Sequence, residues 1–196
     1  AFLFKQDEGF DYFDEAGNSL RKAFLQAPLK FSRISSGYTQ KRFHPVQKRW
    51  KAHLGTDYAA PTGTPIMSVG DGIVVEATYK TFNGNYVKVK HNSTYTTQYL
   101  HMSKIATGIK PGVRVKQGET IGYIGSTGLA TGPHVCFRFW KNGIQIDHRQ
   151  EKIPPSEPIK SSYRGAYDQH LIDWKDRLDD IPLYDKEKPN LAAIGN

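Results

Sequence analysis

Residues 120–140, TIGYIGSTGLATGPHVCFRFW, contain two short strand-forming runs separated by a loop rich in glycine. The second run, 135–140, alternates apolar side chains with a cysteine and an arginine, which is the two-residue period of a half-buried β-strand. The glycines at 122, 125, 128 and 132 indicate sharp corners where one backbone passes close to another. This stretch therefore predicts two strands joined by a tightly packed loop.

The same pattern of short β-branched and aromatic runs extends outward from about Ser32 to Asp147, broken by glycine, proline and asparagine. No long amphipathic helix interrupts it, so we expect an all-β core built as a sandwich or a partly open barrel. Asn83-Gly84 and Pro111-Gly112 mark tight turns. The clearest predicted strands are 72–77 (GIVVEA), 86–91 (YVKVKH), 96–101 (TTQYLH), 120–124 and 135–140.

The two ends of the chain differ in composition from this β region. In residues 1–31, the runs GFDYF and LRKAF flank the turn-rich DEAGNS, and we interpret them as a β-hairpin that packs on the β domain. Residues 32–150 form the predicted main domain. Residues 151–196 comprise a proline-rich connection, a C-terminal helix that docks an apolar stripe on the β domain, and a frayed tail beyond Leu183. The stripe consists of Tyr163, Tyr167, Leu171, Trp174 and Leu178.

Composition limits the classes of function. The chain has 196 residues, enough for one well-buried core, and no apolar run approaches the roughly 20 residues of a membrane-spanning helix. Its net charge of +8 favours anionic polymers, but no nucleic-acid motif accompanies that charge. The N-terminal sequence AFLFKQDEGF does not resemble a signal peptide, so we expect either that a leader has been removed or that residues precede Ala1.

His53 and Asp57 form the first candidate site, in the segment HLGTDYAAPTGTP. Four residues apart on a strand, their backbones would lie about 13 Å apart, too far to bind one ion unless the chain bends between them. Gly55 is placed to allow that bend. Most isolated pairs of this kind are an ordinary surface histidine and a turn aspartate.

His134 and Cys136 form the second candidate site. On a strand they project from the same face, about 6.6 Å apart at the backbone, while Val135 and its apolar neighbours project from the other. An imidazole and a thiolate at this spacing could converge on one metal or one substrate, although a lone cysteine is more often a small buried hydrophobe.

The third candidate is His101, expected to share a strand face with Tyr99. We rank His44 and His91 lower, and expect His148 and His170 to play no part in the site.

Several motifs together resemble the lysostaphin/LytM-type zinc metallopeptidases. The segments FSRISSGYTQKRFHPV, HLGTDYAAPTGTPI, GNYVKVKH, TQYLHMSKI, VKQGETIGYIGSTGLATGPHV and RFWKNGIQID occur in the order that the family shows. The segment DEAGNSLRKAFLQAP resembles the Gram-negative murein D,D-endopeptidases of this family. The resemblance implies a compact antiparallel β-sheet core and an exported enzyme that cuts peptide cross-links of peptidoglycan, with D-alanyl–diaminopimelate as the expected bond.

The resemblance also implies roles for single residues. His53 and Asp57 match two zinc ligands, and His101 and His134 match the two catalytic histidines that do not bind the metal. The third zinc ligand is normally the second histidine of an H-x-H motif, and here that position is Cys136. Because a thiolate is a strong zinc ligand, we expect His53, Asp57 and Cys136 to hold Zn²⁺ with a fourth position open to water.

Two other functions remain open from the sequence. A LytM-like domain that lost its metal through the cysteine change could bind peptidoglycan or activate another wall hydrolase without catalysis. The GDGIVV and GVRVKQGETIG segments could also be halves of a lipoyl- or biotin-carrier domain, but no lysine stands in the expected hairpin setting. We favour the enzyme, with peptidoglycan stem peptides as partner, no nucleic acid, a periplasmic or cell-envelope location and an undefined oligomeric state.

Overall fold

The computed structural model describes residues 1–7, 9–31, 33–44 and 49–181 of the chain. The tail predicted beyond Leu183 lies outside these residues, as does the side chain of His44. The chain divides into two compact units. Lys22–Pro154 form one unit, called the β domain below, and Ala1–Arg21 with Pro155–Asn196 form the other, called the terminal unit.

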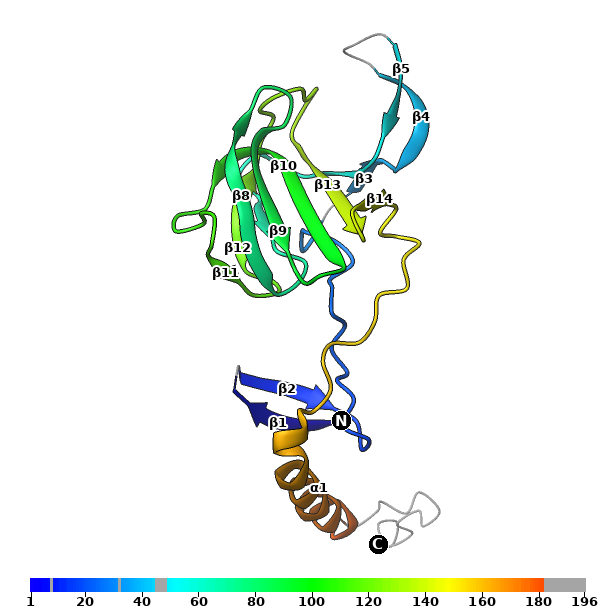
Figure 1. Ribbon diagram of the computed structural model, residues 1–196, viewed down its shortest axis with the longest axis vertical. Helices are drawn as coiled ribbons and strands as arrows, with labels where there is room; N and C mark the ends of the chain where they lie inside the picture. The colour runs from blue at the N-terminus through cyan, green and yellow to red at the C-terminus, as the bar shows by residue number, and fades with distance from the viewer. Residues whose placement is uncertain (8, 32, 45–48, 182–196) are drawn as a thin grey trace, which may run out of the picture. The chain divides into compact units, whose positions relative to one another are not determined.

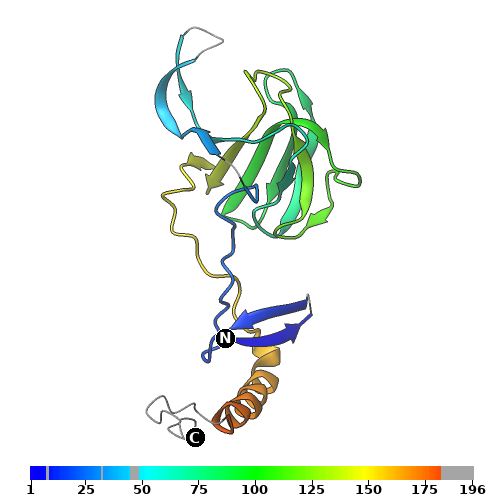
Figure 2. The same ribbon diagram turned by 180° about the vertical axis from the view of Figure 1, so that it is seen from behind.

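The β domain is an antiparallel sheet with strand order β11-β8-β9-β10-β13-β6-β3. Strand β12 pairs with β10 and β7, and β14 pairs with β13, while β4 and β5 form a separate ribbon beside β3 (Figures 1 and 2). The strands are β3 (Arg33–Ser36), β4 (Thr39–His44), β5 (Arg49–His53), β6 (Thr56–Ala59), β7 (Pro65–Met67), β8 (Gly72–Lys80), β9 (Gly84–Lys90), β10 (Tyr95–Ile105), β11 (Arg114–Val115), β12 (Thr120–Ile124), β13 (His134–Lys141) and β14 (Ile144–Ile146).

The core of the β domain confirms the predicted all-β class. Val135, Phe137 and Phe139 all point into one apolar cluster, as the alternation in β13 predicts. Cys136 points to the other side and packs with Tyr86 and Leu100 in a small separate cluster. The two faces of β13 therefore divide into a core face and a face that can carry polar chemistry.

The glycine-rich loop crosses the turn between β8 and β9 at very short range. A Cβ added to Gly84 would lie 2.2 Å from Thr127 Oγ1, and one added to Gly128 would lie 2.3 Å from the Gly84 nitrogen. The predicted turn at Asn83-Gly84 is present, but only Gly84 has a positive φ, of 66°. The glycines of this loop thus allow two backbones to touch, which brings the Thr127 carbonyl to the cleft described below.

The terminal unit contains the expected hairpin, but with different strands. Strand β1 (Phe2–Gln6) pairs with β2 (Gly9–Phe13). The run LRKAF (20–24) forms no strand: the isolated bridge beside β2 joins Phe13 to Ser19, the residue before the run, and Leu20 N donates to the Tyr12 carbonyl oxygen. The predicted pairing of GFDYF with LRKAF is wrong because Phe24 is buried in the core of the β domain.

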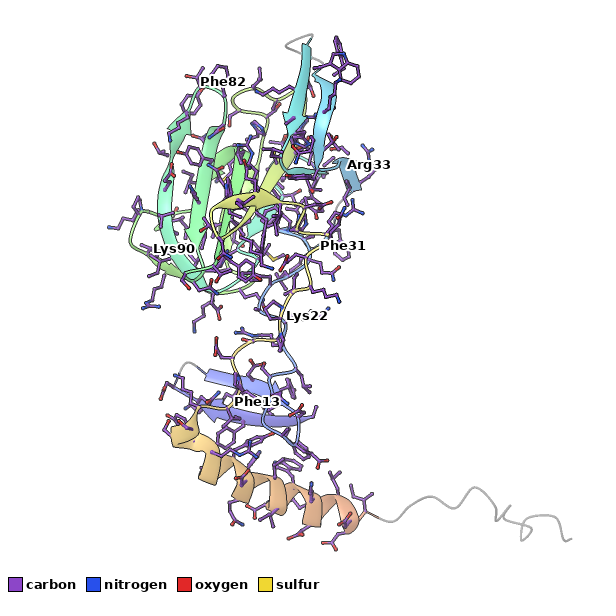
Figure 3. The ribbon with its side chains drawn as sticks, turned by 45° about the vertical axis from the view of Figure 1, so that its right-hand side comes forward. Phe13, Lys22, Phe31, Arg33, Phe82 and Lys90 are labelled. Carbon is purple, nitrogen blue, oxygen red and sulfur yellow. The ribbon has the colours of Figure 1, made fainter. Side chains whose placement is uncertain are left out.

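The helical region of the terminal unit comprises a 3₁₀ turn, η1 (Ser161–Tyr163), and helix α1 (Arg164–Asp179). Its buried Tyr167 and Leu171 pack with Phe13 of the hairpin (Figure 3). Tyr167 and Leu171 of the predicted stripe therefore pack on the hairpin of the same unit, and Trp174 and Leu178 of that stripe are exposed. Among the described residues, no helix has the length and apolar character to cross a membrane.

Candidate metal centre

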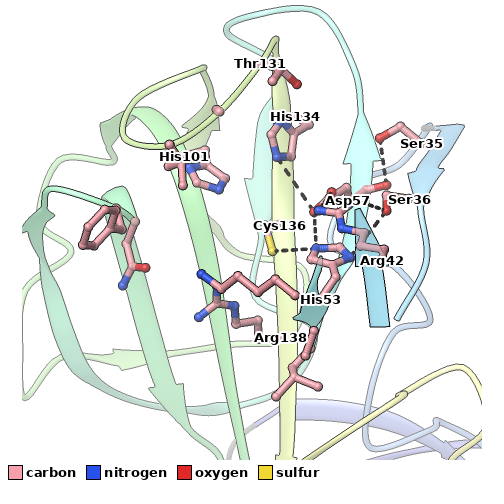
Figure 4. Close-up of a pocket in the computed structure, with 17 residues that line it drawn as sticks. Ser35, Ser36, Arg42, His53, Asp57, His101, Thr131, His134, Cys136 and Arg138 are labelled. Carbon is pink, nitrogen blue, oxygen red and sulfur yellow. Dashed lines mark hydrogen bonds and ion pairs between the residues drawn. The ribbon is translucent and has the colours of Figure 1, made fainter. Parts of the chain in front are cut away.

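A cleft of about 270 Å³ in the β domain contains all five residues that the sequence singles out as site residues. His53 ends β5 and Asp57 lies in β6, so the chain bends between them at residues 54–55, as expected. Cys136 lies directly opposite Asp57 in the β13–β6 pair. His101 and His134 line the same cleft (Figure 4).

Gly55 has a second role that its position in the bend does not reveal. A Cβ at Gly55 would lie 2.9 Å from the Phe137 carbonyl oxygen, 3.0 Å from Arg138 Cγ and 3.1 Å from Cys136 Sγ. Real Cβ atoms rarely come this close to other heavy atoms. A glycine here lets β13 lie against the bend and brings Cys136 within reach of His53 and Asp57.

Three donor atoms of different chemistry converge in this cleft. His53 Nε2 lies 3.0 Å from Asp57 Oδ1 and 3.6 Å from Cys136 Sγ, and the three donor atoms all lie within 4.8 Å of one another. His53 Nδ1 donates to the Gly37 carbonyl oxygen at 2.9 Å, so the Nε2 of a neutral ring carries a lone pair. Two acceptors 3.0 Å apart need a proton or a cation between them.

A zinc ion fits this donor set. Nitrogen, carboxylate oxygen and sulfur are the ligands that zinc accepts, and three protein ligands leave one position for water. The hydrogen bond from His53 Nδ1 to a backbone carbonyl is the usual support of a metal-binding histidine, since it fixes both the tautomer and the ring orientation.

Burial and neighbouring charges set the protonation of the candidate ligands. Burial raises the pKa of the Cys136 thiol to about 12, and the nearby Asp57 carboxylate adds to this effect. Burial alone would also raise the pKa of Asp57, but the hydrogen bond with His53 and the charges of His53 and His134 outweigh it and hold that pKa below its usual value. A bound cation would favour the thiolate that metal binding requires.

His101 and His134 stand together on one side of the three donors. Their ring centroids are 4.8 Å apart, and His134 Nε2 lies 3.8 Å from Asp57 Oδ1. Each Nδ1 donates to a backbone carbonyl at 2.8 Å, that of Thr127 for His101 and that of Gly132 for His134. In the neutral rings, both Nε2 atoms are therefore free to accept a proton.

His101 reaches the cleft by breaking the regular alternation of β10. It has a φ of 66°, and the β10–β9 register shifts between Tyr99 and Met102. Tyr99 is buried in the core, where its hydroxyl accepts a hydrogen bond from the Val69 amide, so the prediction that Tyr99 and His101 share a face is wrong. Burial lowers the pKa of His101 to about 4, against the opposing effect of the Thr127 hydrogen bond.

The remaining histidines with described side chains lie outside the cleft. His91 bonds to the Asp71 carbonyl and the Thr97 hydroxyl, and His148 is buried beside Tyr58. His170 Nε2 bonds to the Leu3 carbonyl in the terminal unit.

Sequence reasoning missed three basic residues of the cleft: Arg42, Lys51 and Arg138. Arg42 bonds to Ser36 and lies 3.8 Å from Asp57 Oδ2. Strand alternation places Arg138 on the face of His134 and Cys136, so this residue could have been found from its spacing. Lys51 stands two residues before His53 on β5, so the same alternation could have found it, whereas no local pattern in the sequence identifies Arg42.

Comparison with known proteins agrees with this geometry. Peptidoglycan DD-endopeptidase ShyC of Vibrio cholerae is 42% identical to this chain, and the match covers 91% of this chain. ShyA of the same organism is also 42% identical, and that match covers 76% of this chain. The chain spans 40% of ShyC and 34% of ShyA.

Solved structures show the same likeness. A zinc-containing peptidase from Vibrio cholerae superimposes with a TM-score of 0.64 and 41% identity, covering 78% of this chain and 47% of the other. The catalytic domain of lysostaphin from Staphylococcus simulans gives a TM-score of 0.52 and 30% identity, covering 59% of this chain and 88% of that domain. The model of Peptidase family M23 matches residues 51–148, which include His53, Asp57, His101, His134 and Cys136. The chain belongs to peptidase family M23.

Proposed function

We propose that this chain is the catalytic part of a zinc-dependent endopeptidase that hydrolyses peptide cross-links of bacterial peptidoglycan. The observation that carries the proposal is the convergence of three metal-donor atoms and two further histidines in one cleft. The similarity to Vibrio DD-endopeptidases supports a D-alanyl–diaminopimelate bond as the target. A periplasmic or cell-envelope location follows from the position of that substrate.

His53, Asp57 and Cys136 would hold the metal. When bound, zinc supplies a Lewis acid that polarises the peptide carbonyl and makes water more acidic. Asp57 and Cys136 are opposite partners in the β13–β6 pair, so the backbone hydrogen bonds of the main sheet fix these two ligands. His53 ends β5 of the separate β4–β5 ribbon, and the short bend at residues 54–55 places it beside them.

His134 is the proposed acceptor of the proton from the attacking water. Its Nδ1–H is held by the Gly132 carbonyl, so Nε2 is the atom that accepts. Asp57 Oδ1, 3.8 Å away, stabilises the imidazolium that forms and keeps it in place for donation to the leaving amine.

His101 is the proposed group that stabilises transition-state charge. Its Nδ1–H is held by the Thr127 carbonyl, so Nε2 can donate a hydrogen bond only in the protonated ring. With a pKa of about 4 the resting ring is neutral, so the proton that it donates would come from the attacking water, whose first proton goes to His134 and whose second can pass to His101 Nε2. The protonated ring would then donate a hydrogen bond to the developing negative charge, before this proton also passes to the leaving amine.

Digestion of defined, cross-linked muropeptides with the zinc-loaded protein tests the function. We expect mass spectrometry to show dimers converted to monomers with a new amino terminus on diaminopimelate. Intact dimers after exhaustive digestion by protein with a full complement of zinc would show that the proposed activity is wrong. The zinc-free protein is the control.

A further inference from the structure

Two basic side chains of the cleft have no acidic partner. Arg138 and Lys51 both line it, and neither makes an ion pair with any described residue of the chain. The Nε of Arg138 is fully buried and has no hydrogen-bond partner among the described atoms. Leaving a buried donor unsatisfied is destabilising, so this guanidinium is kept in the cleft at a cost in stability.

Charge in the cleft is strongly one-sided. Among the described residues that line it, Asp57 is the single acid, and this carboxylate already faces His53 and Arg42. Arg138 also interacts with the Cys136 thiol, whose pKa it lowers against the effect of burial. Neither Arg138 nor Lys51 is paired with a carboxylate of the described residues, so both can attract a carboxylate from outside the chain. An arginine fork suits a carboxylate because it offers two parallel N–H donors.

Arg138 and Lys51 each lie two residues along a strand from one of the proposed metal ligands. Arg138 follows Cys136 by two residues on β13, and Lys51 precedes His53 by two residues on β5. Side chains two apart on a strand share a face, with their Cα atoms about 6.6 Å apart. In Figure 4 Arg138 lies beside Cys136 and His53, on the opposite side from His134.

We propose that Arg138, assisted by Lys51, binds a free carboxylate of the substrate next to the scissile amide. This inference rests on the proposed function. In a D-alanyl–diaminopimelate cross-link, the carbon bonded to the scissile nitrogen also carries a free carboxylate, three bonds from the carbonyl carbon that is attacked. Arg138, two residues along β13 from the proposed ligand Cys136, is placed to reach a carboxylate this close to the attacked carbonyl carbon. The pair would select acidic cross-links over those in which this carboxylate is amidated or absent.

The test compares two synthetic cross-linked dimers that differ only in this group, one with the free carboxylate and one with its primary amide. For the zinc-loaded wild-type protein we expect kcat/KM to be about 10- to 100-fold higher for the carboxylate, the range of a charge-assisted hydrogen bond. Arg138→Gln should bring the ratio of the two values close to one. Lys51→Gln, a change at an exposed residue, should lower it by a smaller factor.

Two further variants serve as controls. Arg114→Gln removes an exposed arginine on β11, outside the cleft, and should leave the ratio as in the wild type. Arg138→Lys should keep part of the preference, because it retains the charge but loses the fork. Zinc content is measured for each variant, since Arg138 lies close to Cys136.

Several results would overturn the proposal. One is an equal kcat/KM of the wild type on both dimers, and another is a preference for the carboxylate dimer that survives in Arg138→Gln. A third is an Arg138→Gln variant that loses activity equally on both dimers because it has lost its zinc. Calorimetric titration of zinc-loaded His134→Ala with each dimer supplies a readout that does not need turnover. If neither dimer is cleaved but the carboxylate form binds more tightly, the proposed function fails and the carboxylate site stands. If both are cleaved and bound equally, the proposed function stands and the carboxylate site fails.

Discussion

Replacing Gly55 with alanine tests how the metal centre is assembled. The glycine has an ordinary φ, so the backbone tolerates alanine and the change adds only one methyl group. That methyl would lie 2.9–3.1 Å from the Phe137 carbonyl, Arg138 Cγ and Cys136 Sγ. The carbonyl belongs to the central strand β13 and cannot move independently, so β13 and the bend must separate by a few tenths of an ångström.

This separation has two expected consequences. Overpacking of this kind costs about 1–3 kcal/mol of stability, which lowers Tm by between about 2 and 12 °C in a protein of this size. Because Cys136 is displaced relative to His53 and Asp57, we expect the affinity for zinc to fall by about 10- to 100-fold, the range seen when support around a metal site is changed.

Gly37→Ala provides the matched control. Gly37 also borders the site, since its carbonyl accepts the His53 hydrogen bond, but a Cβ there meets no atom within 4 Å. Its stability should stay within about 0.5 kcal/mol of wild type. Thermal unfolding of the zinc-free proteins and competition with a chromogenic chelator measure the two effects separately. If Gly55→Ala matches Gly37→Ala in both measurements, the close approach does not assemble the site.

Three other predictions follow from the site and its surroundings. His101→Ala and His134→Ala should retain wild-type zinc content but lower kcat by about 10² or more, and loss of metal in either would make that residue a ligand. Cys136→Ser should lose most of its zinc, and X-ray absorption of the loaded wild type should show sulfur scattering at about 2.3 Å; equal zinc affinity in the variant would contradict the assignment. Burial lowers the pKa of His148 from 6.5 to about 4, so the unfolded chain binds a proton between these values that the folded chain does not. Stability should therefore fall by up to about 3 kcal/mol between pH 6.5 and 4 in urea titrations, and His148→Gln should remove this part of the pH dependence.

Local periodicity predicts the parts of the site that lie on regular strands. The alternation of β13 places Val135 in the core and Cys136 on the other face, because successive strand side chains must project to opposite sides. The bend between His53 and Asp57 is also predictable, since a straight strand would hold them too far apart. The hairpin is different: whether Phe24 pairs with the hairpin or enters the β-domain core depends on contacts distant in sequence.

His101 shows most clearly why periodicity alone is not enough. On a regular β10 strand, His101 would share the core face with Tyr99, and the cleft would lack one of its two histidines. A register shift and a positive φ at His101 turn the ring outward, at a conformational cost of about 1–3 kcal/mol for a residue other than glycine. The Thr127 carbonyl then fixes the ring, and that carbonyl reaches the cleft only because Gly84 and Gly128 let two loops touch. The position of His101 is thus set by the glycine-rich loop, nearly thirty residues further along the chain. It cannot be predicted from the sequence of β10 alone.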